Sequence, residues 1–160
     1  MSTSWYAGPV PKWLNREEDA AWRGYRRMRV LLDLQIARDL AKDSGLSEAD
    51  YDVLSTLSET DGRRMRLSDL AAHMLWSKSR LSHHTARMQQ RGLVVREDCA
   101  DDGRGSWVVL TDAGMDVIVA AAPAHVASVR RHMIDLLTAG ERAALASLSN
   151  RVADRLAGPR

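Results

Sequence analysis

The chain has 160 residues, of which 45% are hydrophobic and 28% charged, a balance typical of a water-exposed globular domain large enough to bury a core. No apolar run reaches the roughly 18 residues that a membrane-spanning helix needs, and the N-terminus lacks the basic-then-apolar order of a signal peptide, so we expect a cytoplasmic protein. The single cysteine excludes an internal disulfide and a zinc site of several cysteines.

The charge is unevenly distributed, although the net charge is only +2. Residues 1–61 contain 8 Lys or Arg against 11 Asp or Glu, residues 62–104 contain 9 against 5, and residues 105–160 contain 6 against 5. A basic excess confined to the middle of the chain indicates a polyanionic partner.

The N-terminal third predicts two helices after an extended arm at residues 1–12. Asn15 and Glu18 have capping-box spacing, and apolar residues at intervals of three to four continue for about 27 residues to a stop before Gly45. At about 1.5 Å per residue this helix is about 40 Å long, more than a compact domain of this size needs, so we expect it to pack on a second copy of the chain. Ser47 and Asp50 are expected to cap the next helix.

The middle of the chain predicts a strand and two helices joined by a tight turn. The segment "RMRL" is the strand, Ser68 is expected to cap the helix "DLAAHM", and "LWS" breaks the chain before a helix that runs from Ser77 to a C-capping glycine, Gly92. The segments "LVVRED" and "SWVVL" on either side of "CADDGRG" predict a β-hairpin.

Two further helices are predicted to complete the chain. Thr111 or Asp112 begins a run that extends to Leu137 and that Pro123 is expected to kink, and Thr138 caps the last helix. This order predicts a mainly α fold with a small β-wing, in which a winged helix-turn-helix is joined to a helical dimerisation region. The helix after Ser77 is the one that would enter a DNA major groove.

Helical geometry divides that helix into two faces. The face expected to pack inward carries Leu81, His84, Thr85 and Met88. The opposite face has no acid, which would repel phosphates. We expect base edges to be contacted by Lys78, Arg80 and His83, and phosphates by Ser77, Ser79, Ser82 and Arg87. A solvated basic surface without a partner is the competing interpretation of the same pattern.

The sequence from "LSDLAAHMLWSKSRLSHHTARMQQRGLVVRE" to "DDGRGSWVVLTDAG" resembles the MarR family of bacterial transcriptional regulators. Three segments carry the resemblance in the family's order: "MQQRGLV" at the end of the recognition helix, "DGRG" in the wing and "LTDAG" after it. The long first helix and the two C-terminal helices fit the family's dimerisation region. The resemblance covers residues 15–157.

The resemblance implies roles for residues of the wing. Arg104 would enter the DNA minor groove, where a narrow A·T-rich groove attracts arginine, and Asp102 would brace Arg104 or the wing turn. The chain departs from the family pattern at two positions of the recognition helix. Gln89 stands where Glu is common, which removes a candidate ion pair, and His84 stands where an aliphatic residue is usual.

The resemblance also implies one domain, residues 1–160, with a DNA-binding region at 46–111 and a dimerisation region at 1–44 and 112–160. We expect a homodimer that represses transcription from a pseudo-palindromic site on double-stranded DNA and is released by a small-molecule effector. A pocket for an aromatic anion would be lined by Trp22, Tyr25, Arg26 and Arg29. The competing interpretation is that these four side chains pack the dimer core.

Other function classes fit the sequence less well. It has no Gly-rich phosphate loop, nucleophile elbow or zinc-protease helix, so we expect neither an enzyme nor a cofactor. His83 and His84 point about 100° apart on a helix and do not suit one metal ion, whereas zinc between subunits at His125 and His132 is left open. Cys99 is interpreted as an inert wing residue. The main alternative is a winged helix that binds another protein without specific DNA binding.

Overall fold

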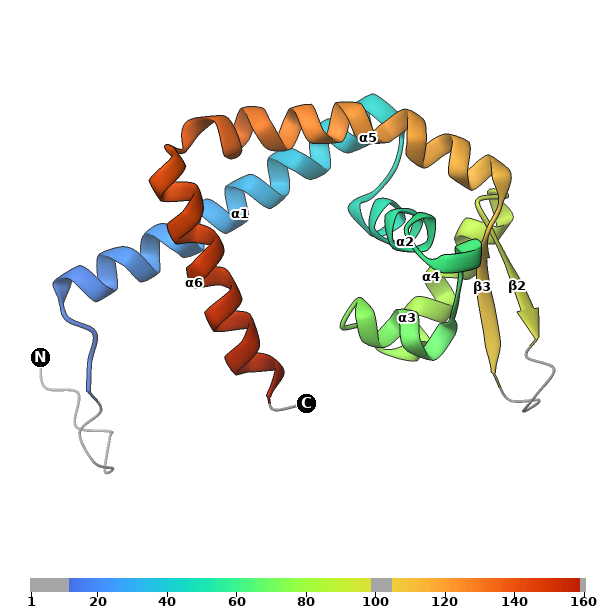
Figure 1. The fold of residues 1–160 in the computed structure, drawn as a ribbon, viewed down its shortest axis with the longest axis horizontal. Helices are drawn as coiled ribbons and strands as arrows, with labels where there is room; N and C mark the ends of the chain where they lie inside the picture. The colour runs from blue at the N-terminus through green and yellow to red at the C-terminus, as the bar shows by residue number, and fades with distance from the viewer. Residues whose placement is uncertain (1–11, 99–104, 159–160) are drawn as a thin grey trace, which may run out of the picture. The chain divides into compact units, whose positions relative to one another are not determined.

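The structure, a computed structural model, describes residues 12–98 and 105–158. These residues are mostly helical, with a small antiparallel sheet (Figure 1). The helices are α1 (Arg16–Ser44), α2 (Glu48–Ser58), α3 (Leu67–His73), α4 (Lys78–Gln90), α5 (Asp112–His132) and α6 (Ala139–Ala157). The strands are β1 (Arg64–Arg66), β2 (Val94–Asp98) and β3 (Ser106–Leu110). The predicted fold class, mainly α with a small β-wing, is confirmed.

The chain divides into two units, and the boundary falls within α1 between Leu34 and Gln35. The larger unit holds the buried core, to which α2 contributes Leu54 and Leu57, α3 contributes Leu70 and α4 contributes Leu81, each fully buried. Burying such a side chain stabilises the fold by about 1.5–3 kcal/mol. The shared core therefore fixes the orientation of α4 relative to α2 and α3.

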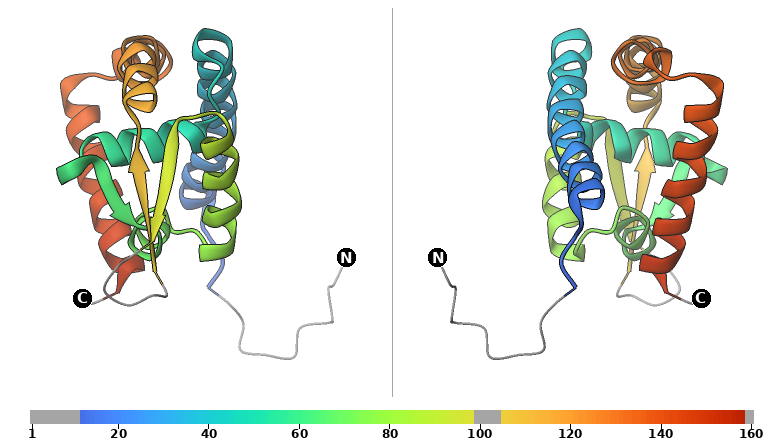
Figure 2. Two further views of the ribbon diagram at one scale, coloured as in Figure 1. Left: turned by 90° about the vertical axis from the view of Figure 1, so that its right-hand side faces the viewer. Right: turned by 90° about the vertical axis from the view of Figure 1, so that its left-hand side faces the viewer.

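The three strands are ordered β1-β3-β2 and both pairings are antiparallel (Figure 2). In β3, Val108 is fully buried and faces the core, as does Val94 at the start of β2, which is paired with Leu110 of β3. Because side chains alternate along a strand, Trp107 lies on the opposite face of the sheet, where it is paired with Arg66 of β1 and Glu97 of β2. The hairpin β2–β3 is thus a two-faced wing attached to the core by one face.

The segment after β3 packs closely on the segment after α4. The Thr111 hydroxyl donates to the carbonyl oxygens of Gly92 and Leu93, at 2.7 and 3.0 Å, and accepts from the backbone N–H of Gly114 at 2.9 Å. A Cβ atom at Gly114 would lie 2.1 Å from the Leu93 carbonyl oxygen. The "LTDAG" segment therefore joins the start of α5 to the end of the recognition helix, and its glycine is required by this close approach.

The helix boundaries agree with most of the predicted caps. Asn15, Ser47 and Thr138 each cap a helix through a reciprocal pair of hydrogen bonds with an acid three residues later. The prediction for Ser68 was wrong. Because the extended residue Arg66 leads directly into α3 at Leu67, Ser68 lies inside the first turn, and its hydroxyl donates to the Asp69 carboxylate instead.

The predicted end of the fifth helix was also wrong. α5 continues past Pro123 and ends at His132, and a 3-10 turn, Ile134–Leu136, follows it. The chain leaves the helix at Met133, whose backbone angles are not helical.

Candidate nucleic-acid interface

Helix α4 has one buried face and one face open to solvent. Its buried residues are Leu81, His84, Thr85 and Met88, as the sequence predicts. The residues predicted to contact DNA are exposed or half-exposed: Ser77, Lys78, Ser79, Arg80, Ser82, His83 and Arg87. The Ser77 hydroxyl caps the helix by accepting from the backbone N–H of Arg80 at 3.2 Å. The open face thus presents three cations, an imidazole and several hydroxyls, and no carboxylate occurs in the helix.

The Arg80 guanidinium is held by an aromatic ring. Leu75, in the turn between α3 and α4, has a left-handed backbone with φ of 54°, and the next N–H, that of Trp76, donates to the Ala71 carbonyl oxygen at 2.9 Å. This turn places the Trp76 ring against α4, where its centroid is 3.9 Å from the central carbon of the Arg80 guanidinium. Stacking of this kind restricts the guanidinium while leaving its N–H edge free to donate.

Arg96 joins the recognition helix to the wing. From β2 it donates to the Ser82 hydroxyl of α4 at 3.1 Å and to the Ser106 hydroxyl of β3 at 3.0 Å. Arg96 was not among the predicted DNA contacts, although it is the last basic residue of a stretch, residues 70–96, that contains no Asp or Glu. Because Ser82 accepts from Arg96, its own hydroxyl hydrogen stays available for a phosphate. The two elements that would meet DNA are therefore linked on the exposed side.

A buried carboxylate links α4 to α2 on the inner side. Asp50, only 5% exposed, accepts from the Arg91 guanidinium at 2.8 Å and from the Ser47 backbone N–H at 3.1 Å. Burial acts to raise the pKa of Asp50, but the hydrogen bonds from Arg91 and Ser47 outweigh it and lower the pKa below its usual value. The sequence had identified Asp50 as a helix cap only, because its partner Arg91 lies 41 residues away.

Two basic residues of β1 pack against a tryptophan of the wing. The central guanidinium carbons of Arg64 and Arg66, both in β1, lie 4.8 and 5.4 Å from the Trp107 ring centroid. The predicted minor-groove residue Arg104, its support Asp102 and the wing cysteine Cys99 lie outside the described residues. Their roles therefore stay predictions.

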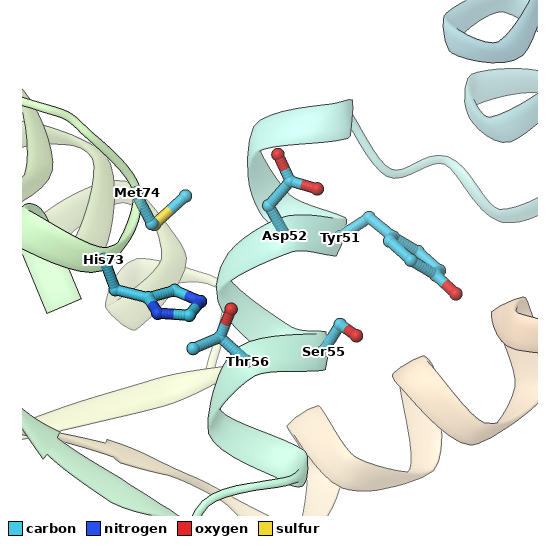
Figure 3. Close-up of a pocket in the computed structure, with 6 residues that line it drawn as sticks. All are labelled: Tyr51, Asp52, Ser55, Thr56, His73 and Met74. Carbon is cyan, nitrogen blue, oxygen red and sulfur yellow. The ribbon is translucent and has the colours of Figure 1, made fainter. Parts of the chain in front are cut away.

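A pocket of about 270 Å³ lies between α2 and the end of α3, and none of its lining residues belongs to α4 (Figure 3). Its lining residues are Tyr51, Asp52, Ser55, Thr56, His73 and Met74.

The two C-terminal histidines contact different groups. The centroid of the His125 ring lies 4.1 Å from that of the Tyr51 ring, and Nε2 of His132 lies 2.9 Å from a carboxylate oxygen of Asp39. Across residues 12–98 and 105–158, no three His, Cys, Asp or Glu side chains come together as metal ligands.

The four residues predicted to line a ligand pocket lie on the N-terminal part of α1. Trp22 and Tyr25 are half-exposed and stack on each other with ring centroids 5.9 Å apart. Arg26 lines an open depression together with Arg23, Arg27, Val30 and Leu31. Trp22, Tyr25 and Arg29 are not among the lining residues of this depression, and the ligand pocket stays a prediction.

The architecture of the larger unit defines a class of protein. α3, a tight turn and α4 form a helix-turn-helix whose second helix exposes a basic face, and the hairpin β2–β3 follows it as a wing. This is a winged helix-turn-helix, the arrangement in which the second helix lies in the major groove of DNA. None of the described helices is long and apolar enough to cross a membrane.

Comparisons with known proteins place this chain within a family. The MarR family model matches residues 44–105. The transcriptional regulator HosA of Escherichia coli O127:H6 is 31% identical over 102 residues, which cover 63% of this chain and 73% of HosA. Two solved structures from Streptomyces coelicolor are also similar. AbsC, a MarR family transcriptional regulator, is 44% identical with a TM-score of 0.88, covering 93% of this chain and 100% of AbsC.

The second structure, Sco3205, is a MarR family transcriptional regulator solved in complex with DNA. It is 39% identical with a TM-score of 0.86, covering 89% of this chain and 90% of the Sco3205 chain. The chain belongs to the MarR family of transcriptional regulators. The members of this family are transcription regulators and not enzymes, so the expectation of a non-enzymatic protein agrees with the family.

Proposed function

We propose that this protein is a homodimeric repressor that acts in the cytoplasm, binds a pseudo-palindromic site on double-stranded DNA, and is released by a small molecule. The open face of α4 carries the DNA-binding part of the proposal, because Lys78, Arg80 and Arg87 project from a helix without any carboxylate. Such a face attracts phosphates and offers donors to base edges. The solved complex of the relative Sco3205 with DNA supports the same function.

Two features of the wing and α4 support a defined geometry on DNA. Arg96 links α4 to the hairpin, and stacking on Trp76 restricts Arg80. With both elements held, α4 would read the major groove while the wing reaches the adjacent minor groove, where Arg104 is the proposed contact. A dimer of such units would read two half-sites about 34–36 Å apart.

Exposed apolar residues support the dimer. α6 has no buried residue, and Leu148, Val152 and Leu156 recur on one side of it with exposures of 50%, 47% and 81%. On α1, Trp22 and Tyr25 head a series of apolar side chains that are about half exposed. Contiguous apolar helix faces are rarely left in water, so we propose that residues 1–44 and 112–160 form the dimerisation region.

Release by a small molecule rests on the same part of α1. The stacked rings of Trp22 and Tyr25 lie on a helix that also carries Arg26 and Arg29, which suits an aromatic anion if the second subunit completes the site. A ligand that binds better to a dimer with wrongly spaced recognition helices would lower DNA affinity by shifting the population. Packing of the dimer core is the competing role for these residues.

The Arg80→Ala variant tests whether α4 reads base edges. We expect base preference at one position of each half-site to relax, at a cost of about 1–3 kcal/mol per lost bidentate contact. The measurement is fluorescence anisotropy on duplexes in which each base pair of a selected site is varied in turn. Arg80→Lys is the matched control, since it keeps the charge and removes the bidentate fork.

The two variants together separate the possible roles of Arg80. If Arg80 reads a base, Arg80→Lys restores part of the affinity but not the preference. If both variants keep the wild-type preference and differ only in affinity, Arg80 is a phosphate contact and the assignment to base reading is wrong.

A further inference from the structure

His84 is the one histidine on the buried face of α4, and it is 7% exposed. Its neighbours on that face, Leu81, Thr85 and Met88, pack into the core. The edge of the Trp76 ring meets the His84 ring at 89°, with centroids 5.5 Å apart. An imidazole in this position takes the place of an apolar side chain. Burying its two nitrogens costs free energy unless each has a polar partner.

Both nitrogens face charged groups. Nδ1 lies 3.1 Å from Nη2 of Arg87, and Nε2 lies 3.2 Å from Oδ1 of Asp50. A guanidinium has only donors, so Nδ1 must be the unprotonated acceptor and the ring proton must sit on Nε2, toward Asp50. The Nε2 contact is close but lacks the alignment of a formed hydrogen bond. The contact with Arg87 therefore requires neutral His84 in a single tautomer.

Arg87 itself belongs to the open face of the helix. Its guanidinium and that of Arg80 line a pocket of about 300 Å³ at the start of α2, and His83, His84 and Trp76 line the same pocket. Arg80 is fixed there by stacking on Trp76. The hydrogen bond to His84 Nδ1 holds Arg87 in the same pocket, and the Arg87 guanidinium suits a DNA phosphate.

We propose that His84 is a positioning residue for DNA binding, which in its neutral form holds the Arg87 guanidinium in place for a DNA phosphate. The inference rests on the proposed DNA-binding function and adds a residue from the inner face of α4 to it. His84 itself does not touch DNA. It acts through Arg87, and Asp50 favours the tautomer that leaves Nδ1 free to accept.

Protonation would break this arrangement. Burial lowers the pKa of His84, Asp50 and a hydrogen bond with the Ala49 backbone act to raise it, and Arg87 and Arg91 lower it further, so the pKa lies below the ordinary value of 6.5. The charged groups that face the ring are Asp50 from α2, Arg87 from α4 and Arg91 directly after α4. When His84 gains its second proton, Nδ1 becomes a donor next to a cation, and Arg87 loses its acceptor.

Two substitutions of His84 separate the roles of its nitrogens. His84→Asn keeps an acceptor near the position of Nδ1, whereas His84→Gln keeps a polar group near Nε2 and loses the acceptor for Arg87. At pH 7.5 we expect His84→Asn to bind a selected duplex within about twofold of wild type, and His84→Gln to bind about tenfold more weakly. Thermal unfolding of both variants checks that each is folded.

The Arg87→Ala background shows whether the effect passes through Arg87. There, His84→Gln should cause no further loss of affinity. A purely structural role would give equal losses for the two His84 variants, or the same loss with and without Arg87, and either result would overturn the inference. If wild type itself shows no preference for any duplex, the proposed function fails instead, which is a distinct outcome.

Acidification supplies an independent readout. The affinity of wild type divided by that of His84→Asn should fall as the pH is lowered from 7.5 to 5, because only wild type can lose the Nδ1 acceptor. The other histidines are common to both proteins and cancel in this ratio. A ratio that rises as the pH is lowered would contradict the requirement for neutral His84.

Discussion

The Gly114→Ala variant is expected to lose about 3 kcal/mol or more of its free energy of unfolding. An added Cβ would lie 2.1 Å from the Leu93 carbonyl oxygen and 2.8 Å from Cδ1 of Leu110. The first of these atoms is backbone and already accepts from the hydroxyl and the backbone N–H of Thr111, so it cannot move aside without breaking the hydrogen bonds that anchor the N-cap residue of α5. The added methyl group would push the start of α5 away from Leu93, at the end of the recognition helix. Chemical denaturation measures the resulting change in the free energy of unfolding.

Gly140→Ala is the matched control for this prediction. Gly140 also lies in the first turn of a helix, α6, but a Cβ there would meet no atom within 4 Å. We expect its stability to change by no more than about 1 kcal/mol, in the favourable direction if at all. Equal unfolding free energies for Gly114→Ala and wild type would show that Gly114 does not lie this close to the Leu93 carbonyl oxygen.

The Val152→Asp variant is expected to convert the proposed dimer into a monomer. Val152 is central to the apolar side of α6, between Leu148 and Leu156, and no residue of α6 is buried in a single chain. A carboxylate in a dimer interface would be desolvated without a partner, which costs several kcal/mol. Sedimentation velocity at micromolar concentration should show the shift in mass.

The loss of the dimer should also weaken DNA binding. Two linked half-sites bind about 10²–10⁴ times more tightly than one, so Val152→Asp should lose at least about 100-fold in affinity for a palindromic duplex. Asn150→Asp places the same charge on the opposite side of α6 and should leave both mass and affinity unchanged. A dimer that survives Val152→Asp would contradict the proposed role of this face.

The sequence predicted the elements of the fold well because their signals are local. Capping boxes, apolar periodicity and the glycine after α4 are all read within a few residues, and Asn15, Ser47, Thr138 and Gly92 were assigned on that basis. The start of α3 was misjudged because Ser68 resembles a cap, whereas the preceding strand leads into the helix two residues earlier. A capping residue is recognised from the few residues that follow it, and these do not show where the preceding strand ends.

The open face of α4 was predicted for the same reason, since helical geometry alone separates Arg80 from Leu81. What holds that face in place was not predictable. The contacts of Asp50 with Arg91 and of Arg96 with Ser82 join residues 41 and 14 positions apart, so they exist only after tertiary packing. The presence of His84 on the buried face could be noticed in the sequence, but its tautomer follows only from the positions of Arg87 and Asp50.

The measurement that tests the central claim most directly is a titration of the purified protein on DNA at several salt concentrations. The duplex is the one most enriched from a random library, and its scrambled counterpart is titrated beside it. We predict a preference of about 10³-fold or more for the selected duplex, with affinity falling steeply as salt rises because several phosphates are neutralised. Equal, weak binding to both duplexes would contradict sequence-specific recognition and favour a winged helix that binds a protein partner.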